Sequence, residues 1–407
     1  MNHESFRWPI RCKAAVLEQF GEQFLVEEVE VAPPKEEEVR IKNVHLGTLM
    51  VRQILATGLC HSDLFALNGG YANFSCPIIL GHEAVGLVES VGPGVEGLAP
   101  GDTVIPCMLP NCRKCRLCKS TRTNLCEKCP VVMRGLLDDG TTRVTWRDNQ
   151  VTVMAGIGTF AEYIVANQFS VAKIEPVQVP AEACLLGCAV PTGYGSVVRA
   201  ANVREGSTVG IWGLGGVGLA AVLGCRERRA ARVIGVDVNP NKFPVAQRLG
   251  CTDFVNPTQV EGSLSQHLIA ITEGGLDYAI VAVGNLECMV RDSLHNTFSN
   301  PKHPNYTNLL NNGNTWEAAL ASLHPGWGKL VVVGLTPPGS FLPVPLYELI
   351  LGKTVLGCDM GGWKMRDGVP CLVDLYLSGK LPLAEFVSHT IPLHEINKGM
   401  ELLKNGK

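Results

Sequence analysis

The stretch Thr208–Gly218, TVGIWGLGGVG, decides the fold of this chain, because it joins an apolar strand to a helix through a glycine-rich turn. TVGIW is short and rich in residues that favour strands, and the helix-like LAAVLGC follows the last glycine directly. The alternation continues in RVIGVDV, NKFPVAQRLG and DFVNP, and later in LDYAIVAV and KLVVVGL. Buried apolar strands that alternate with helices predict an α/β fold, with a doubly wound parallel sheet connected by right-handed crossovers.

The glycine turn has the spacing of a dinucleotide site. Its GxGxxG pattern is weak evidence alone, but here it lies between a predicted strand and a predicted helix. Gly213 permits the tight turn, Gly215 lets the backbone approach a pyrophosphate, and Gly218 packs the helix close to its strand. The pyrophosphate would lie at the helix N-terminus, against Gly213, Gly215, Gly216, Val217 and Gly218. The alternative is a tight turn that binds no ligand.

Asp237 extends this pattern. It lies 19 residues after Gly218, at the end of RVIGVD. A carboxylate there accepts hydrogen bonds from both ribose hydroxyls and repels a 2′-phosphate. The sequence therefore predicts a Rossmann domain that binds NAD in preference to NADP.

Composition limits the classes of function. The 407 residues suffice for about two domains, and 46% of them are hydrophobic and 18% charged, as in ordinary globular proteins. A net charge of −3 argues against a general affinity for nucleic acid. We see neither a secretion signal nor a run of about 18 apolar residues, so we expect a cytoplasmic protein without a membrane span. In that compartment, the 16 cysteines are interpreted as thiols and metal ligands rather than disulfides.

The first part of the chain has a different pattern. Residues 12–110 contain the short runs CKAAVL, FLVEEVEV, EAVGLVESVG and TVIPCML, which glycine and proline separate. Short strands of this kind predict a curled, mostly antiparallel β domain.

Four cysteines lie close together in the stretch Asn111–Cys126, NCRKCRLCKSTRTNLC. At this spacing four thiolates can surround one tetrahedral Zn²⁺ and leave no open position, so the site would fix a loop. The basic residues between them offset the negative charge of the thiolates. A nucleic-acid-binding zinc module, a disulfide knot and an iron–sulfur centre are the alternatives. The predicted ligands are Cys112, Cys115, Cys118 and Cys126.

A second set of ligands is scattered along the chain. Cys60 begins the motif CHSD, His82 lies in GHE, and Cys188 lies in LLGCAVPTGYG. Two cysteines and one histidine form a three-ligand zinc site, whose fourth position is open to water or substrate. Singly, a free cysteine is typical of a protein core. Together, and before a dinucleotide fold, the three residues predict a catalytic zinc.

These motifs together resemble the zinc-dependent medium-chain alcohol dehydrogenases of the animal and plant type, a family that includes the glutathione-dependent formaldehyde dehydrogenases. The similarity covers most of residues 12–407 and rests on GLCHSD, GHEAVG, the four-cysteine lobe, LLGCAVPTGYG, GLGGVG and VIGVDVN. It implies a β-rich (GroES-like) catalytic domain from residues 1–189 and 360–407, with a structural zinc lobe at about 110–127. It also implies a Rossmann domain at 190–359 and a homodimer formed through the Rossmann sheet.

The resemblance implies hydride transfer between a primary or secondary alcohol and NAD, giving an aldehyde or a ketone. The catalytic zinc polarises the substrate oxygen, and Ser62 hydrogen-bonds that oxygen and passes its proton outward. Asp63 fixes the tautomer of His82, and Glu83 lies behind the zinc. Three further residues match family positions that touch the cofactor: His61, Thr192 and Lys242.

The chain departs from its family at several positions. Phe65 replaces a histidine that completes a proton relay in some relatives, so the proton must leave through ribose hydroxyls, water or another group. Asn73 and Pro130 stand where glutathione-dependent members carry an acidic residue and an arginine. We therefore expect ordinary alcohols as substrates, with S-(hydroxymethyl)glutathione as the alternative.

Two apparent insertions, at 43–53 and 291–317, are further departures. The final ELLKNGK stops short of a segment that relatives carry, from which we expect weaker NAD binding. An inactive or non-enzymatic zinc protein is a third alternative. A zinc-free quinone reductase is disfavoured by the three intact ligand positions.

Overall fold

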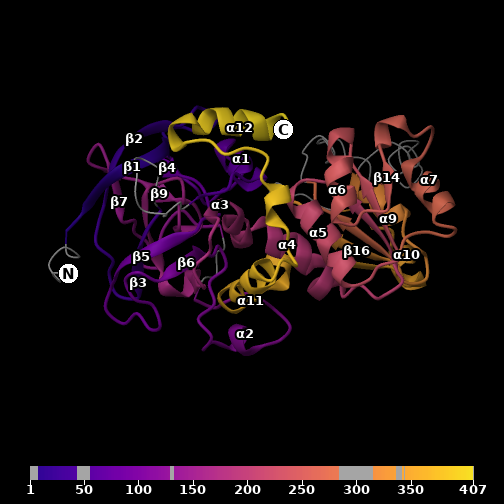
Figure 1. The fold of residues 1–407 in the computed structure, drawn as a ribbon, viewed down its shortest axis with the longest axis horizontal. Helices are drawn as coiled ribbons and strands as arrows, with labels where there is room; N and C mark the ends of the chain where they lie inside the picture. Colours follow the sequence, from indigo (N-terminus) through magenta and orange to yellow (C-terminus); the bar gives the residue numbers. More distant parts are fainter. Residues whose placement is uncertain are drawn as a thin grey trace. The chain divides into compact units, whose positions relative to one another are not determined.

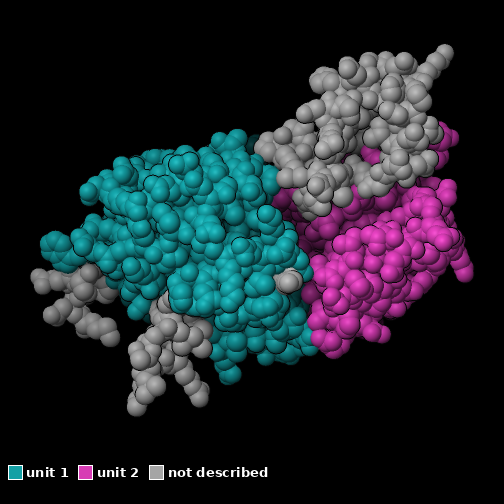
Figure 2. Space-filling model, turned by 90° about the horizontal axis from the view of Figure 1, so that it is seen from above, with its two compact units in different colours: residues 1–189, 363–407 teal, residues 190–362 magenta. Residues whose placement is uncertain are grey.

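The computed structural model describes residues 8–43, 56–128, 133–283, 315–335, 342 and 344–406 (Figure 1). The chain divides into two compact units, Met1–Ala189 with Trp363–Lys407, and Val190–Gly362, which Figure 2 shows in different colours. Pro130 and most of the two apparent insertions, 44–53 and 291–314, lie outside the described residues. No helix of the described ranges is long and apolar enough to cross a lipid bilayer.

The first unit is built on two sheets, with the strand orders β8-β7-β2-β1-β4-β9 and β10-β3-β5-β6-β11. Among its described strands every pairing is antiparallel except that of β4 with β9. The strands are β1 (Ile10–Leu17), β2 (Leu25–Val31), β3 (Glu38–Lys42), β4 (Ile78–Ile79), β5 (Gly86–Val91), β6 (Thr103–Pro106), β7 (Val144–Trp146), β8 (Asn149–Gln150), β9 (Thr152–Val153), β10 (Tyr163–Asn167) and β11 (Val171–Lys173).

Short helices and the C-terminal segment complete this unit. They are α1 (His61–Leu67), α2 (Arg116–Lys119), α3 (Pro180–Ala183), α11 (Met365–Leu377) and α12 (Ile396–Lys404). α12 packs against α1, although more than 300 residues separate them (Figure 1). The Asn397 amide also connects α12 to the residue before β2, because it accepts from Phe24 N–H at 2.9 Å and donates to Phe24 O at 3.0 Å. The C-terminal segment therefore supports the helix that carries the motif CHSD.

The second unit contains one parallel sheet, with the order β14-β13-β12-β15-β16-β17. The strand order reverses between β12 and β15, which is the switch point where dinucleotides bind in this fold. The strands are β12 (Thr208–Trp212), β13 (Arg232–Val236), β14 (Asp253–Val255), β15 (Tyr278–Val281), β16 (Lys329–Val332) and β17 (Thr354–Gly357).

The helices of the second unit are α4 (Ala189–Gly195), whose first residue belongs to the other unit, and α5 (Gly216–Glu227), α6 (Phe243–Leu249), α7 (Leu264–Ile271), α9 (Thr315–Ala321) and α10 (Leu346–Leu351). Since crossovers between parallel strands are right-handed, α5 and α6 cover one face of the sheet, and α7 and α9 cover the other. Trp212, Val281, Trp316 and Leu330 form part of the buried core. The predicted fold, a doubly wound parallel sheet plus an antiparallel β domain, is confirmed.

Candidate active site and structural metal site

Four predicted site residues converge in the first unit. The ligand atoms of Cys60, His82, Glu83 and Cys188 all lie within 4.8 Å of one another. His82 and Glu83 are almost fully buried, and Cys188 is 6% exposed. Cys60 precedes α1, His82 and Glu83 are consecutive residues between β4 and β5, and Cys188 lies directly before α4. The tertiary fold therefore brings three separate segments together.

The Asp63 carboxylate connects the segments that carry Cys60 and His82. Its Oδ2 accepts from Cys60 N–H at 2.9 Å and caps α1, and its Oδ1 accepts from Gly81 N–H at 3.1 Å. The same Oδ1 lies 3.0 Å from Nδ1 of His82, and both side chains are fully buried. Because a carboxylate can only accept, Nδ1 carries the proton and Nε2 is directed to the cluster. Nε2 is buried and has no hydrogen-bond partner among the described residues.

The electrostatics of the cluster favour a cation. A hydrogen bond with Cys188 lowers the pKa of the Cys60 thiol well below its usual range; burial opposes this shift and His82 adds to it. Burial lowers the pKa of His82, but Asp63 and Cys60 outweigh it, so the net shift is well upward. Burial, aided by the charge of Cys60, raises the pKa of Glu83 to about 8. The site therefore stabilises positive charge, which protons or a divalent cation can supply.

These observations fit a zinc ion. Two thiols and one imidazole are the donors that zinc prefers, and three protein ligands leave a fourth position for substrate. The bare Nε2 of His82 is the atom that such an ion would satisfy. Glu83 lies beside the three donors, with its Oε1 likewise buried and without a partner in the described part of the chain.

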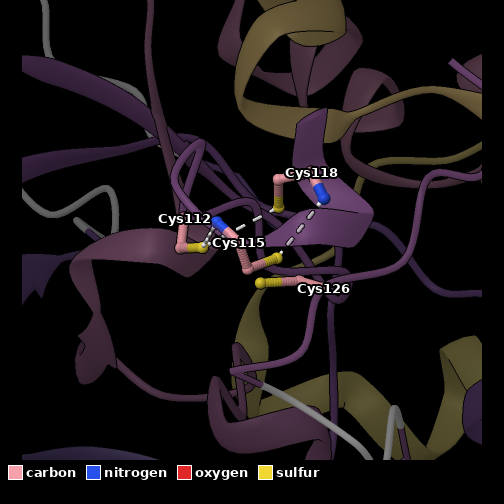
Figure 3. Close-up of side chains that lie close together, drawn as sticks. All are labelled: Cys112, Cys115, Cys118 and Cys126. Atoms are coloured by element: carbon pink, nitrogen blue, oxygen red, sulfur yellow. Dashed lines mark hydrogen bonds between the residues drawn. The ribbon is translucent and has the colours of Figure 1, made fainter. Parts of the chain in front are cut away.

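The four cysteines of the lobe also converge, and Figure 3 shows their sulfur atoms gathered together. Cys115 N–H donates to Cys112 Sγ at 3.4 Å, and Cys118 N–H donates to Cys115 Sγ at 3.3 Å. The Sγ atoms of Cys112 and Cys118 are 3.9 Å apart, and these cysteines are free thiols. Burial acts to raise the pKa of the Cys115 thiol, but hydrogen bonds from the backbone N–H groups of Glu127 and Cys118 outweigh burial. The pKa of Cys115 is lowered to about 6. Such N–H donors stabilise thiolates, so the lobe fits a closed zinc site.

Distant residues anchor the lobe. Lys364 Nζ donates to the carbonyl oxygens of Cys118 and Ser120, the latter at 2.6 Å. Arg366 Nη1 donates to Asn111 O at 3.0 Å. Three lobe cations are in ion pairs: Arg113 with Asp367, Lys114 with Glu96, and Arg116 with Glu127. The pairs with Asp367 and Glu96 join the lobe to other parts of the first unit.

Replacing Lys364 with methionine should lower the free energy of unfolding by about 2 kcal/mol, because two carbonyl oxygens of the lobe lose a charged donor. Urea unfolding measures the change. Lys119→Met is the matched control, since Lys119 is an exposed lysine of the same lobe, and it should shift stability by less than about 0.5 kcal/mol. Equal effects of the two substitutions would contradict the anchoring role.

The glycine turn in the second unit has the shape of a dinucleotide cradle. Gly213 has φ +89°, and a Cβ on Gly218 would lie 1.7 Å from Gly213 O, so these two glycines are required by the turn itself. Gly215 differs, because a Cβ there would meet no atom of the described residues within 4 Å. That open space lies where α5 begins, at Gly216 and Val217, and it fits a pyrophosphate at the helix N-terminus.

Asp237 is fixed beside this turn. Its Oδ2 accepts from Leu214 N–H at 2.7 Å, and its Oδ1 accepts from Asn239 N–H at 2.8 Å. Lys242 Nζ lies 3.2 Å from Oδ2. The structure therefore brings Asp237 and Lys242 together with the glycines.

Two other predicted cofactor residues, Thr192 and His61, lie on the helices α4 and α1. Thr192, in α4, is buried with its Oγ1 3.7 Å from Met360 Sδ. Its neighbour Gly193 abuts the start of α5, because a Cβ on Gly193 would lie 1.9 Å from Val217 O. His61 is exposed at the start of α1, in the other unit.

The sequence analysis missed several residues that support the two sites. Lys364 follows Cys118 by 246 residues, and Arg366 follows Asn111 by 255, so no local spacing relates them. Gly58 closes over Glu83, since a Cβ there would lie 2.1 Å from Glu83 Oε2. Its signal, one glycine ahead of the motif CHSD, is too weak to recognise in a single sequence.

Comparisons with known proteins match both units. Residues 47–176 match the Alcohol dehydrogenase GroES-like domain, and residues 216–296 match the Zinc-binding dehydrogenase family. The chain is 41% identical over 399 residues to alcohol dehydrogenase class-3 of Myxine glutinosa, covering 98% of this chain and 96% of that protein. It is 39% identical over 401 residues to alcohol dehydrogenase class-3 of Drosophila melanogaster, with the same coverage.

Solved structures agree. The crystal structure of benzyl alcohol dehydrogenase from Acinetobacter calcoaceticus matches with a TM-score of 0.79 at 27% identity, covering 98% of this chain and 97% of that chain. An alcohol dehydrogenase zinc-binding domain protein from Burkholderia ambifaria matches with a TM-score of 0.80 at 28% identity and the same coverage. The chain therefore belongs to the zinc-dependent medium-chain alcohol dehydrogenase family.

Proposed function

We propose that this protein transfers a hydride between a primary or secondary alcohol and NAD, with one catalytic and one structural zinc ion per chain. Cys60, His82 and Cys188 would hold the catalytic ion, and the four lobe cysteines would hold the structural one. The convergence of these three ligands, with His82 oriented by Asp63, is the observation that carries the proposal. We assign the first unit as the catalytic domain and the second as the NAD-binding domain.

Each side chain of the centre has a definite task. Cys60, His82 and Cys188 would hold a zinc ion, which would supply a Lewis acid for the substrate oxygen. Ser62 is 6% exposed, and its Oγ lies 3.5 Å from Cys60 Sγ. This hydroxyl accepts the proton of the substrate hydroxyl and passes its own proton outward. Asp63 keeps the imidazole of His82 in the ligating tautomer, and buried Glu83 lines the rear of the centre.

The second unit binds the dinucleotide, which supplies the hydride acceptor. The open space at Gly215 lets the pyrophosphate approach the backbone, and the first N–H groups of α5 donate to it. The Asp237 carboxylate accepts hydrogen bonds from the ribose hydroxyls and repels a 2′-phosphate, so NAD is preferred over NADP. Lys242 beside Asp237, Thr192 in α4 and His61 in the other unit are the remaining proposed cofactor contacts.

Ordinary alcohols are the first substrate class that we propose, and the glutathione adduct of formaldehyde is the second. The class-3 names of two relatives favour the second, whereas Asn73, an exposed polar but uncharged residue, favours the first. The deciding experiment is metal analysis combined with NAD⁺ reduction across an alcohol series, and with formaldehyde in the presence and absence of glutathione. Formaldehyde oxidation that rises steeply with glutathione would reverse the order. A failure to reduce NAD⁺ with any of these substrates would reject the function.

We also propose that the protein is a cytoplasmic homodimer without a nucleic-acid or membrane partner. The support for the dimer is an apolar surface beside the edge strand β17. Leu346, Tyr347 and Ile350 of α10 are 75%, 69% and 78% exposed. Exposed side chains of this size, next to a strand that is the last of its sheet among the described residues, are typical of a surface that a second copy covers.

Replacing Ile350 with aspartate should convert the dimer to a monomer, because a second copy would bury the new carboxylate without a partner. Sedimentation equilibrium measures the mass. Ile269→Asp is the control, since Ile269 is an exposed isoleucine on α7, and this variant should stay dimeric. A parent protein that is monomeric, or an Ile350→Asp variant that remains dimeric, would reject this interface.

A further inference from the structure

Three aromatic rings pack together beside α1. The chain folds back after this helix, and Gly70 N–H donates to Phe65 O at 3.0 Å. The Tyr71 ring packs edge-on against Phe65, with centroids 4.8 Å apart at 83°, and against Phe74 at 5.0 Å. Contacts on two sides fix the ring, so its hydroxyl has a defined position.

The Tyr71 hydroxyl is directed inward, toward the catalytic centre. The residue is half-buried, but its hydroxyl oxygen is inaccessible to solvent and forms no hydrogen bond with any described residue. Ser62 is close enough to lower the pKa of this hydroxyl, whereas the negative charges of Cys60 and Asp63 raise it. Burial is the main cause that raises the pKa of Tyr71, and the two charges add to it, so the phenol keeps its proton. A buried donor without an acceptor costs about 1–3 kcal/mol, and a function would explain why it is kept.

Ser62 is the natural acceptor for this proton. Its Oγ lies 3.5 Å from Cys60 Sγ, and sulfur is a weak hydrogen-bond partner that leaves the serine hydroxyl free to rotate. To work, Ser62 must direct one lone pair to the substrate hydroxyl and its own proton to the exit. A phenol O–H that donates to the other lone pair would hold this arrangement, and such contacts tighten when substrate binds.

We propose that Tyr71 is a positioning residue, whose hydroxyl donates to Ser62 Oγ and orients that serine for proton transfer. Tyr71 itself transfers no proton, and Phe65 and Phe74 hold its ring in place. The inference rests on the proposed function, because it assigns a role within the same centre.

The test is Tyr71→Phe, which removes the hydroxyl and keeps the ring. We expect kcat to fall about tenfold, the equivalent of one hydrogen bond, with KM, NADH affinity and zinc content unchanged. In a Ser62→Ala background the same substitution should change kcat less than about twofold, because two residues that act together are not additive. Tyr376→Phe is the control, since Tyr376 donates to Glu182 in α3, and kcat should stay at the parent value.

A second readout does not depend on activity. In protein labelled with ¹³C at the tyrosine ring carbon that bears the hydroxyl, the Tyr71 resonance is the one that disappears in Tyr71→Phe. It should move in Ser62→Ala and stay fixed in Tyr376→Phe. An unmoved resonance, or kinetic effects of the two substitutions that multiply, would overturn the proposal. If the parent oxidises no alcohol, the proposed function fails, and the resonance alone decides the contact of Tyr71 with Ser62.

Discussion

Replacing Cys188 with serine should remove one of two zinc ions per chain and reduce kcat/KM for alcohols at least about a thousandfold. A serine hydroxyl stays protonated at neutral pH and does not replace a thiolate ligand. The site then has one thiolate fewer and binds the ion more weakly, and the polarisation that the ion would supply is worth several kcal/mol. Zinc content by mass spectrometry and initial rates of NAD⁺ reduction measure both effects.

Cys184→Ser is the matched control for this prediction. Cys184 lies four residues earlier, is 2% exposed, and already donates from its Sγ to Ala181 O at 3.3 Å, a bond that serine retains. We expect two zinc ions and a kcat/KM within about threefold of the parent. Circular dichroism checks that both variants fold. A folded Cys188→Ser variant with two zinc ions and the parental kcat/KM would show that the ligand set is wrong.

The sequence predicts the fold well where strands and turns are coded locally. TVGIW coincides with β12, and the longer runs RVIGVDV, DFVNP, LDYAIVAV and KLVVVGL contain β13, β14, β15 and β16, because buried parallel strands are short apolar runs between helices. The four-cysteine lobe is equally local, since its ligands lie within one short stretch. Local spacing specifies such features before any tertiary contact forms.

The catalytic centre is different, because only the tertiary fold assembles it. Cys60, His82 and Cys188 are recognisable through family motifs, and so is Asp63 as the partner of His82, whereas the supporting groups on distant segments are not. Asp63 joins the start of α1 to Gly81 and His82, and Lys364 reaches the lobe from the start of α11. Tyr71 carries no motif, and its relation to Ser62 depends on how the chain folds back after α1. Supporting residues that carry no motif, such as Lys364 and Tyr71, are therefore the part of a site that the structure has to supply.

Replacing Gly215 with alanine should weaken NADH binding about a hundredfold while leaving the protein folded. In the part of the chain that the structure describes, a Cβ at this position meets no atom within 4 Å, and the backbone angles of φ −83° and ψ −170° suit any residue. The methyl group would instead occupy the space through which a pyrophosphate approaches the turn. The loss of two charge-assisted hydrogen bonds, at about 1.5 kcal/mol each, corresponds to about a hundredfold in affinity. Fluorescence titration with NADH measures the change.

Stability separates this effect from damage to the turn. For Gly215→Ala, a lower entropy of the unfolded chain and a poorer helix N-cap oppose each other, so the free energy of unfolding should change by less than about 1 kcal/mol. For Gly218→Ala the methyl group would lie 1.7 Å from Gly213 O, so α5 must shift, and we expect a loss of about 3 kcal/mol together with NADH binding. If Gly215→Ala bound NADH as tightly as the parent, the open space at the start of α5 would not be the pyrophosphate site, and the assignment of the second unit to NAD would fall with it.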